Sequence, residues 1–562
     1  MTQTPALTFY TSFTGGTLAR LATAAGLPAV SEPLDAIETE TQKGPAFFWA
    51  TAEAVSPAFA AAQRMEDVDP AQVCEDAAAF GRRLCRHAEG RPALLAASLV
   101  PALPGRGLGP LELTHEAGLK RLLMQMNLTL ADTLAGSSVL LLDAERWLAA
   151  AGPQAYQPKH WYVAKIPFSD GVFRAAITDL TATRRAQRGE ARKIILTDLD
   201  DTLWGGILGE VGWEKLRLGG HDYIGEMHQD IQRALKAWSN TGVQLAILSK
   251  NDEQNALEAL ASHPEMILKE SDFAGWRIDW NDKAANLQSL LSELRLGLES
   301  AVFIDDNPVE RDRIRQTFPQ VFVPDLPADK TQWPGLIRNL DLFDRAALSD
   351  EDRARSRMYQ AERARNQDAV KTAGQMESRE DWLRSLEMQV TASPLNGTDM
   401  QRAVQLLNKT NQMNLTTRRL SEEELKAWLN EPGREFWTFR VADKFGDTGL
   451  TGLLGLEVLA ETALITDFVM SCRVIGRQVE NVLLAHAYTR ARASGAVKLE
   501  AKLLETERNT PCLEFFQKDA GFQEEAGRVF TWDMGTPYAV PSTIGFSFQE
   551  GEAEKLLTET RL

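Results

Sequence analysis

The chain has 562 residues, 44% of them hydrophobic and 25% charged, and a formal net charge of −17 at pH 7. This length is too great for one hydrophobic core and predicts roughly three domains of about 150 residues each. The acidic balance argues against a nucleic-acid or anionic-membrane binder, and no apolar stretch approaches the roughly 20 residues of a membrane span. We therefore expect neither a nucleic-acid nor a membrane partner.

The four cysteines form no CxxC pair and no metal-ligand cluster, which argues against structural zinc. The first residues, "MTQTPALTFY", lack the basic and apolar regions of a signal peptide, so we expect a cytoplasmic protein with free thiols. Cys74, Cys85 and Cys512 are interpreted as structural.

Residues 1–188 are predicted to form an α/β domain, because apolar strands such as "ALLAASLV" and "SVLLLDA" alternate with helical stretches. In "FYTSFTGGTLARL" a strand leads through a turn of small residues into a helix, where a hydrolase would carry its nucleophile. Ser12 occupies that position, but no paired Asp and His pattern follows. A non-catalytic role is favoured, such as covering the active site of another domain or docking a partner.

Residues 189–345 repeat a βαβ pattern and predict a doubly wound parallel sheet. The strands are expected at "IILTDLD", "VQLAILS", "MILK" and "AVFIDD". Side chains that could take part in catalysis follow these strands or begin a helix between them. They are Asp198, Asp200, Ser249, Lys283, Asp305 and Asp306. Because ligands bind at the carboxyl ends of parallel strands, we expect these groups to form one site.

This series resembles the haloacid dehalogenase-like phosphotransferases, whose site combines "DxDxT", a hydroxyl, a lysine and an acidic pair. The resemblance implies that Asp198 attacks phosphorus and Asp200 acts as acid and base. It also implies a Mg²⁺ cofactor, since the carboxylates would otherwise repel the phosphate. The implied metal ligands are Asp198, the backbone of Asp200, and Asp306, with Asp305 as an alternative. The implied phosphate-binding residues are Thr202, Ser249, Lys250, Asn251 and Lys283.

The spacing of these motifs leaves no room for a large cap domain. Asp198 and Ser249 are 51 positions apart, and Ser249 and Lys283 are 34 apart. An uncapped site is open to solvent, so another domain or a macromolecular partner must help to enclose the substrate. This favours a substrate attached to a carrier protein.

The remainder of the chain predicts a linker, a third domain and a tail. Residues 346–384 include the charged stretch "SDEDRARSRMYQAERARNQ" and predict a solvated helical linker. Residues 385–540 place strand-like segments before a long helix and predict an α+β domain. Residues 541–562 look irregular.

Motifs from both later parts extend the resemblance to the FkbH-like family of glyceryl-acyl-carrier-protein synthases. They are "DLDDTLWGGILGE", "LSKND", "FIDDNPVERDRIRQTFPQVFVPDLP", "LLNKTNQMNLTTRR" and "MSCRVIGRQVE". The family resemblance implies an SGNH-hydrolase-like first domain and a third domain similar to acyl-CoA N-acetyltransferases (GNAT). It implies use of D-1,3-bisphosphoglycerate, removal of its 3-phosphate, and transfer of the glyceryl group to the phosphopantetheine arm of an acyl carrier protein in polyketide-type biosynthesis.

The same resemblance suggests residues for the acyl group and the carrier arm. Cys472 is the candidate thiolate, although a small buried cysteine would also suit this position, and the acyl group could instead pass directly to the carrier. Candidate binding residues for the acyl group and the arm are Asn411, Asn414, Arg473, Gly476 and Arg477. Helix capping and turns would explain the two asparagines equally well.

Two other functions stay open on the sequence alone. One is a magnesium-dependent phosphatase fused to a coenzyme A-dependent N-acetyltransferase that acts on another small metabolite. The other is non-enzymatic, with the first and third domains serving as docking modules in a biosynthetic assembly.

Overall fold

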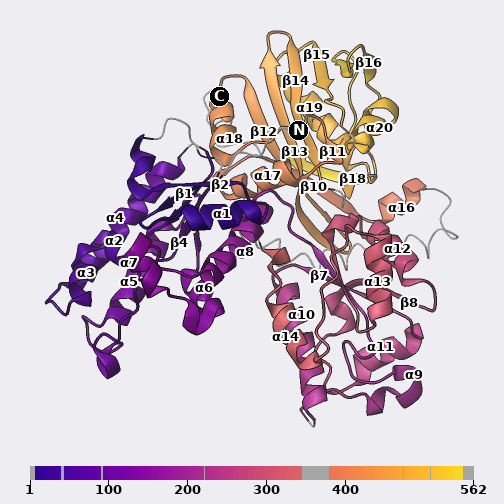
Figure 1. The fold of residues 1–562 in the computed structure, drawn as a ribbon. Coiled ribbons are helices and arrows are strands. Elements are labelled where there is room, and N and C mark those ends of the chain that lie inside the picture. Colours follow the sequence, from indigo (N-terminus) through magenta and orange to yellow (C-terminus); the bar gives the residue numbers. More distant parts are fainter. Residues whose placement is uncertain are drawn as a thin grey trace. The chain divides into compact units, whose positions relative to one another are not determined.

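The computed structural model describes residues 7–39, 44–89, 91, 93–220, 222–344, 379–471, 474–506 and 508–548 (Figure 1). The chain divides into two compact units, Met1–Ala191 with Asp344–Ala346, and Arg192–Phe343 with Ala347–Leu562. We call residues 7–191 the N-terminal domain, Arg192–Phe343 the central domain and residues 379–548 the C-terminal domain. The first unit ends close to the predicted boundary at 188.

The N-terminal domain is an α/β domain with a parallel sheet in the order β2-β1-β3-β4-β5. Its strands are β1 (Leu7–Thr11), β2 (Ala29–Pro33), β3 (Ala46–Trp49), β4 (Leu94–Ala97) and β5 (Val139–Leu142). Its helices are α1 (Gly16–Ala24), α2 (Ala52–Val55), α3 (Pro57–Gln63), α4 (Pro70–Ala88), α5 (Leu119–Leu134), α6 (Ala144–Ala151), α7 (Pro158–Ala164) and α8 (Asp170–Gln187). Aromatic rings fill one side of the core, where Trp49 stacks on Phe168 at 5.0 Å between ring centroids.

The central domain has the predicted doubly wound parallel sheet, in the order β8-β7-β6-β9. Its strands are β6 (Ile194–Thr197), β7 (Gln244–Ser249), β8 (Phe273–Ile278) and β9 (Ala301–Ile304). Its helices are α9 (Leu208–Val211), α10 (Tyr223–Asn240), α11 (Glu253–Ser262), α12 (Lys283–Glu293), α13 (Pro308–Thr317) and α14 (Trp333–Arg338). Neighbouring residues of β6 belong to separate cores: Ile195 packs with residues of α10 and α11, whereas Leu196 packs with residues of α12. Helices therefore cover both faces of the sheet.

The predicted strand "MILK" is wrong, because the third strand along the chain is β8, a few residues later. Met266 and Leu268 are buried, which explains the apolar run. Their segment needs no neighbouring strand, since Oε1 of buried Gln232 accepts hydrogen bonds from the backbone N–H groups of Ile267 (2.9 Å) and Leu268 (3.0 Å). A side chain on α10 thus satisfies the backbone that a strand partner would otherwise satisfy.

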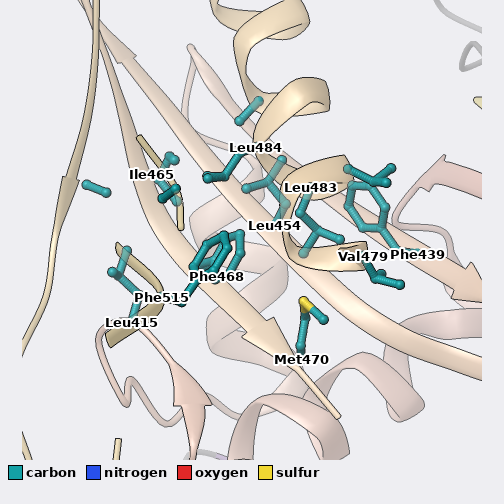
Figure 2. Packing of buried hydrophobic residues seen from close by; sticks show 14 of the residues in the cluster. Leu415, Phe439, Leu454, Ile465, Phe468, Met470, Val479, Leu483, Leu484 and Phe515 are labelled. Carbon is teal, nitrogen blue, oxygen red and sulfur yellow. The ribbon is translucent and has the colours of Figure 1, made fainter. Parts of the chain in front are cut away.

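The C-terminal domain is built on one mixed sheet, in the order β16-β17-β15-β14-β13-β12-β10-β18, with β11 beside β14. Its strands are β10 (Met388–Pro394), β11 (Met413–Asn414), β12 (Arg434–Asp443), β13 (Gly446–Leu459), β14 (Thr462–Met470), β15 (Lys498–Lys502), β16 (Gln523–Glu525), β17 (Val529–Asp533) and β18 (Ile544–Phe548). Its helices are α16 (Arg379–Ser385), α17 (Gly397–Lys409), α18 (Glu422–Leu429), α19 (Val479–Ala493) and α20 (Thr510–Lys518). Figure 2 shows its main core, in which Leu483 and Leu484 of α19 pack with Leu454 of β13 and with Phe468 and Met470 of β14.

The predicted irregular tail is wrong over Ile544–Phe548, which forms β18. This strand pairs in parallel with β10, from Met388 opposite Ile544 to Ala392 opposite Phe548. Ile544 is buried in the main core of the C-terminal domain, and that contact fixes a segment that looked irregular by itself. The predicted helical linker falls largely on residues 345–378, outside the described residues, and α16 begins after them.

None of the helices in the described ranges is both long and apolar enough to cross a membrane.

Candidate active site

The candidate site lies at the carboxyl edge of the central sheet, where β6 runs into a tight turn. Asp198 follows β6 directly, and Asp201 adopts a left-handed conformation with φ of 51°. Aspartate tolerates this region better than most residues, and Asp201 Oδ1 stabilises the turn by accepting the backbone N–H of Gly206 at 2.9 Å. Asp201 is therefore a turn residue, which leaves Asp198 and Asp200 for chemistry.

Three carboxylates meet at this edge. Asp198, Asp305 and Asp306 each offer one oxygen, and these oxygens lie within 4.8 Å of one another. The last two follow β9, the strand that pairs with β6, so the parallel register brings the two ends of the motif series together. The structure thus assembles both members of the acidic pair with Asp198 and does not choose between them.

Lys283, the first residue of α12, holds this cluster together. Its Nζ lies 3.0 Å from Asp198 and 2.6 Å from Asp305, and its side chain is only 5% exposed. Burial alone would lower the pKa of Lys283, but the two carboxylates outweigh burial and raise it. Burial and the nearby Asp198 raise the pKa of Asp305 even with the ammonium group beside it. Such opposed environments are typical of active sites.

Asp200 is held separately from the three clustered carboxylates. Its Oδ1 accepts hydrogen bonds from Trp204 Nε1 (2.9 Å) and the backbone N–H of Leu208 (3.1 Å), and its Oδ2 accepts one from Asn251 Nδ2 (3.1 Å). Burial, with a further contribution from Asp198, raises the pKa of this carboxyl. A positioned carboxyl with a raised pKa suits a general acid and base.

The other predicted phosphate-binding residues have different surroundings. Ser249 is buried at the end of β7, and Asn251 is buried against Asp200. Thr202 Oγ1 accepts the backbone N–H of Asp306 at 3.1 Å, so it ties the first motif to the last. Lys250 is 40% exposed and pairs with Glu310 of α13 at 2.7 Å. The structure brings Asn251 to the carboxylates and turns Lys250 away toward Glu310.

Lys330 is a residue of this site that the sequence did not reveal. Its Nζ donates to the backbone oxygen of Asp201 at 2.9 Å and lies 3.7 Å from Asp306 Oδ2. It begins the 3-10 turn Lys330–Gln332, which precedes α14, and its Nζ lies 5.4 Å from the ring centroid of Trp333. Burial raises the pKa of Asp306, and Lys330 opposes that effect. No motif pattern surrounds "PADKTQW", so the sequence offered no signal for it.

The donor set fits Mg²⁺. The three clustered carboxylates supply the hard oxygen ligands that this cation prefers, at a spacing that one ion could bridge. The Asp200 side chain is committed to three donors, so Asp200 would contribute through its backbone, as the sequence implied.

In the C-terminal domain, the predicted asparagines serve the fold. Asn414 is fully buried; its Oδ1 accepts the backbone N–H of Thr417 at 2.8 Å and its Nδ2 donates to the backbone oxygen of Thr410 at 3.0 Å. Asn411 accepts a hydrogen bond from Arg419. These contacts match the capping and turn roles that the sequence left open, and they leave the Asn414 side chain without access to solvent.

The segment around Asn414 fills a gap in the sheet. β14 and β15 pair in parallel only over Thr462–Ile465 and Lys498–Ala501. Past that point β11 lies against β14, and the backbone of Leu415 donates to Phe468 (3.1 Å) and accepts from Leu504 (2.9 Å). β14 and β15 therefore separate beyond these residues, and the backbone of residues 413–415 lies between them.

The turn before α19 contains two of the other predicted arm-binding residues, Gly476 and Arg477. Gly476 has φ of 78°, and its backbone N–H donates to the Glu480 carboxylate, so it is not an open donor for a ligand phosphate. Arg477 is 5% exposed, and its Nη1 lies 3.9 Å from Asp443. Cys472 and Arg473 lie outside the described residues.

The other cysteines lie as expected for structural residues. Cys512 is fully buried on α20, and burial raises the pKa of its thiol to about 12, which keeps it protonated and unreactive. Cys74 and Cys85 are partly buried on α4.

Comparison with solved structures shows the fold. The chain is similar to the N-terminal part of the protein BF1531 from Bacteroides fragilis, a structure containing a phosphatase domain complexed with Mg. That similarity has 23% identity and a TM-score of 0.55 and covers 61% of this chain and 94% of that chain. The covered share is more than twice the length of the central domain, so the likeness extends beyond it. At this identity the likeness shows the fold alone: over the covered residues this chain has the fold of the N-terminal part of BF1531.

Two N-acetyltransferases also match part of the chain at low TM-scores. A variant of spermidine N-acetyltransferase SpeG from Vibrio cholerae has 18% identity and a TM-score of 0.21, covering 26% of this chain and 95% of that chain. The ribosomal-protein-S18-alanine N-acetyltransferase from Escherichia coli has 14% identity and a TM-score of 0.20, covering 29% of this chain and 97% of that chain. No protein-family model and no curated protein matches the chain.

Proposed function

We propose that the central domain is a Mg²⁺-dependent phosphoryl-transfer site in which Asp198 is the nucleophile. The observation that carries this proposal is the cluster of Asp198, Asp305 and Asp306, with carboxylate oxygens within 4.8 Å of one another and Lys283 against two of them. When bound, Mg²⁺ would neutralise the repulsion between these acids and the phosphate and polarise the phosphoryl oxygens.

Asp198 and Asp200 have different roles in the proposed reaction. An Asp198 oxygen forms a bond to phosphorus while the bond from phosphorus to the substrate oxygen breaks, and Asp200 donates a proton to that oxygen. Asp200 then takes a proton from water, whose oxygen attacks phosphorus and releases phosphate and free Asp198. Lys283 and the buried Ser249 hold the phosphoryl oxygens. The raised pKa of Asp200 supports its role as the proton donor.

We further propose that the substrate is D-1,3-bisphosphoglycerate and that its 3-phosphate is removed. Attack on the phosphorus of the acyl phosphate would release 3-phosphoglycerate and lose the activated carbonyl. The glyceryl group would then pass as a thioester to the phosphopantetheine arm of an acyl carrier protein, either through Cys472 or directly. The motifs "LLNKTNQMNLTTRR" and "MSCRVIGRQVE" support this assignment through their family resemblance.

Intact-protein mass spectrometry with phosphate-release measurements tests the proposal. The full chain is incubated with Mg²⁺, freshly generated 1,3-bisphosphoglycerate and a phosphopantetheinylated carrier protein. Asp198→Asn should abolish phosphate release, whereas the matched control Asp201→Asn should retain it, because an amide oxygen can still accept the Gly206 N–H. Wild type should give a hydroxylamine-labile glyceryl adduct on the carrier, and an adduct on the enzyme that is missing in Cys472→Ala would favour the route through that thiol.

Phosphate release without any carrier adduct would reject glyceryl transfer and leave the phosphatase function. Equal loss of activity in Asp198→Asn and Asp201→Asn would reject the assignment of the nucleophile, since only one of these acids faces the cluster.

A further inference from the structure

A second candidate site lies in the N-terminal domain, separate from the phosphatase motifs. A cleft of about 920 Å³ opens where β1 and β2 end, bounded by the β1–α1 turn, the start of the segment after β2, and one face of α4. The carboxyl edge of a parallel sheet is the usual place for a ligand in such domains, and this volume lies within the range of small-molecule pockets.

The β1–α1 turn presents hydrogen-bond donors to this cleft. Ser12 Oγ accepts the backbone N–H of Thr51 at 2.9 Å, which fixes the oxygen, while its contact to Thr51 Oγ1 is long at 3.5 Å. The hydroxyl proton is thus available to a ligand. The first turn of α1 begins beside it at Gly16, and the preceding residue, Gly15, makes no side-chain cap. Uncapped amide groups at a helix start favour an anion.

Two cations line the same cleft and have no ion-pair partner among the residues that the structure describes. Arg86 on α4 and Lys165 at the end of α7 both line it, and neither forms an ion pair with any residue in the described part of the chain. The Lys165 ammonium group lies 4.9 Å from the centroid of the Trp161 ring. Both side chains belong to exposed residues, so they can turn toward a ligand.

The acids of the cleft are largely committed elsewhere. Asp35 pairs with Arg83 at 3.2 Å, and Asp76 accepts hydrogen bonds from Ser56 (2.6 Å) and Gln72 (2.9 Å). Glu32 is exposed at the rim. Asp76 and Glu32 keep their charges, but the side chains that have donors to offer a ligand in this cleft are Arg86, Lys165 and Ser12.

Apolar side chains also line the cleft, and no carboxylate or imidazole among the described residues contacts the serine. Val55 and Phe80 line the cleft beside the polar groups. Among the described residues, no carboxylate or imidazole hydrogen-bonds to Ser12, so nothing there can take its proton for an attack on an ester. We propose that this cleft binds a small organic anion, with its carboxylate or phosphate head at Ser12, Arg86 and Lys165 and a short apolar body against α2 and α4, without hydrolysing it.

Titration calorimetry on the full-length protein in EDTA tests the proposal, with butyrate, butyl phosphate and butylamine as probes. Without metal the clustered carboxylates of the phosphatase site repel anions, so that site should not contribute. Both anions should bind to wild type more tightly than butylamine. Arg86→Gln and Lys165→Gln should each weaken binding of the anions roughly tenfold, or about 1.4 kcal/mol. The matched controls Arg82→Gln, on α4, and Lys159→Gln, on α7, lie outside the cleft and should leave binding unchanged.

Several outcomes would overturn the proposal. Equal binding of butylamine, no binding of either anion, or equal effects of the control variants would reject an anion site at this cleft. The ratio of butyrate to butyl phosphate affinity identifies which head group the site prefers. Loss of p-nitrophenyl butyrate hydrolysis in Ser12→Ala, with no change in phosphate release by the central domain, would reject binding without hydrolysis.

Discussion

Replacing Lys283 with methionine tests whether one ammonium group stabilises the carboxylate cluster of the central domain. Methionine keeps most of the apolar length but removes the ammonium group that pairs with the Asp305 side chain, which is 0% exposed. Removing one partner of a buried ion pair costs about 3–5 kcal/mol, a large share of the roughly 5–15 kcal/mol that holds a domain folded. We therefore expect the metal-free central domain to become much less stable.

Hydrogen–deuterium exchange of β6 and β9 peptides in the full-length, metal-free protein measures this loss. Exchange in Lys283→Met should be roughly 100-fold faster or more, and Lys283→Met combined with Asp305→Asn should recover most of the protection. Lys236→Met is the matched control, since Lys236 is 38% exposed and its pair with Asp272 should be worth less than about 1 kcal/mol. If the two lysine variants exchange alike, the buried pair does not stabilise the domain.

Three further changes test other contacts. Lys330→Gln removes a cation 3.7 Å from Asp306, so it should tighten Mg²⁺ binding and raise the KM for a phosphorylated substrate, whereas Lys330→Arg should change both less; unchanged Mg²⁺ titrations would count against this role. His486 is fully buried, and burial lowers its pKa to about 4, so the unfolded chain takes up a proton below about pH 6.5 that the folded domain refuses until about pH 4. The free energy of unfolding of the C-terminal domain should therefore fall by roughly 3 kcal/mol between those pH values, and thermal unfolding of His486→Phe should show a smaller fall than wild type. Asn509→Ala leaves the buried backbone oxygen of Asn414 and the partly buried backbone oxygen of Leu504 without the amide that donates to them at 3.1 and 2.9 Å. At about 1–3 kcal/mol for the buried oxygen this should speed exchange of β11 peptides, and unchanged exchange would show that β11 is held by other contacts.

The fold of the central domain could be predicted where local pattern and tertiary pairing agree. β6, β7 and β9 are apolar runs followed by polar site residues, and the structure has them at those positions. "MILK" was wrongly predicted as a strand because its apolar side chains are buried. Its backbone N–H groups donate to Gln232, a residue on α10, and not to a neighbouring strand. β18 was missed for the complementary reason, since its pairing with β10 spans more than 150 positions and leaves no local signal.

Some residues of the candidate site could likewise be predicted from the sequence, and one could not. Asp198, Asp200, Lys283 and the acidic pair were predictable because each follows a strand or opens a helix at one sheet edge. Lys330 could not be predicted, because it lies far from the motifs in the sequence. It joins the site through a hydrogen bond to the backbone of Asp201 and its position 3.7 Å from Asp306. A cation in a loop carries no periodicity, so only the folded backbone reveals which carboxylate it faces.

The three acids of "DLDDT" illustrate how one short segment serves catalysis and turn formation together. Asp198 belongs to the carboxylate cluster, and Asp200 is oriented by Trp204, Leu208 and Asn251. Asp201 adopts the left-handed conformation of the turn that gives them different surroundings. A straight strand would place Asp198 and Asp200 on the same face, where both would share one environment. The turn instead leaves Asp198 beside Lys283 and raises the pKa of Asp200 by burial. A nucleophile beside an ammonium group and an acid with a raised pKa need this difference in surroundings, and the third aspartate helps to produce it.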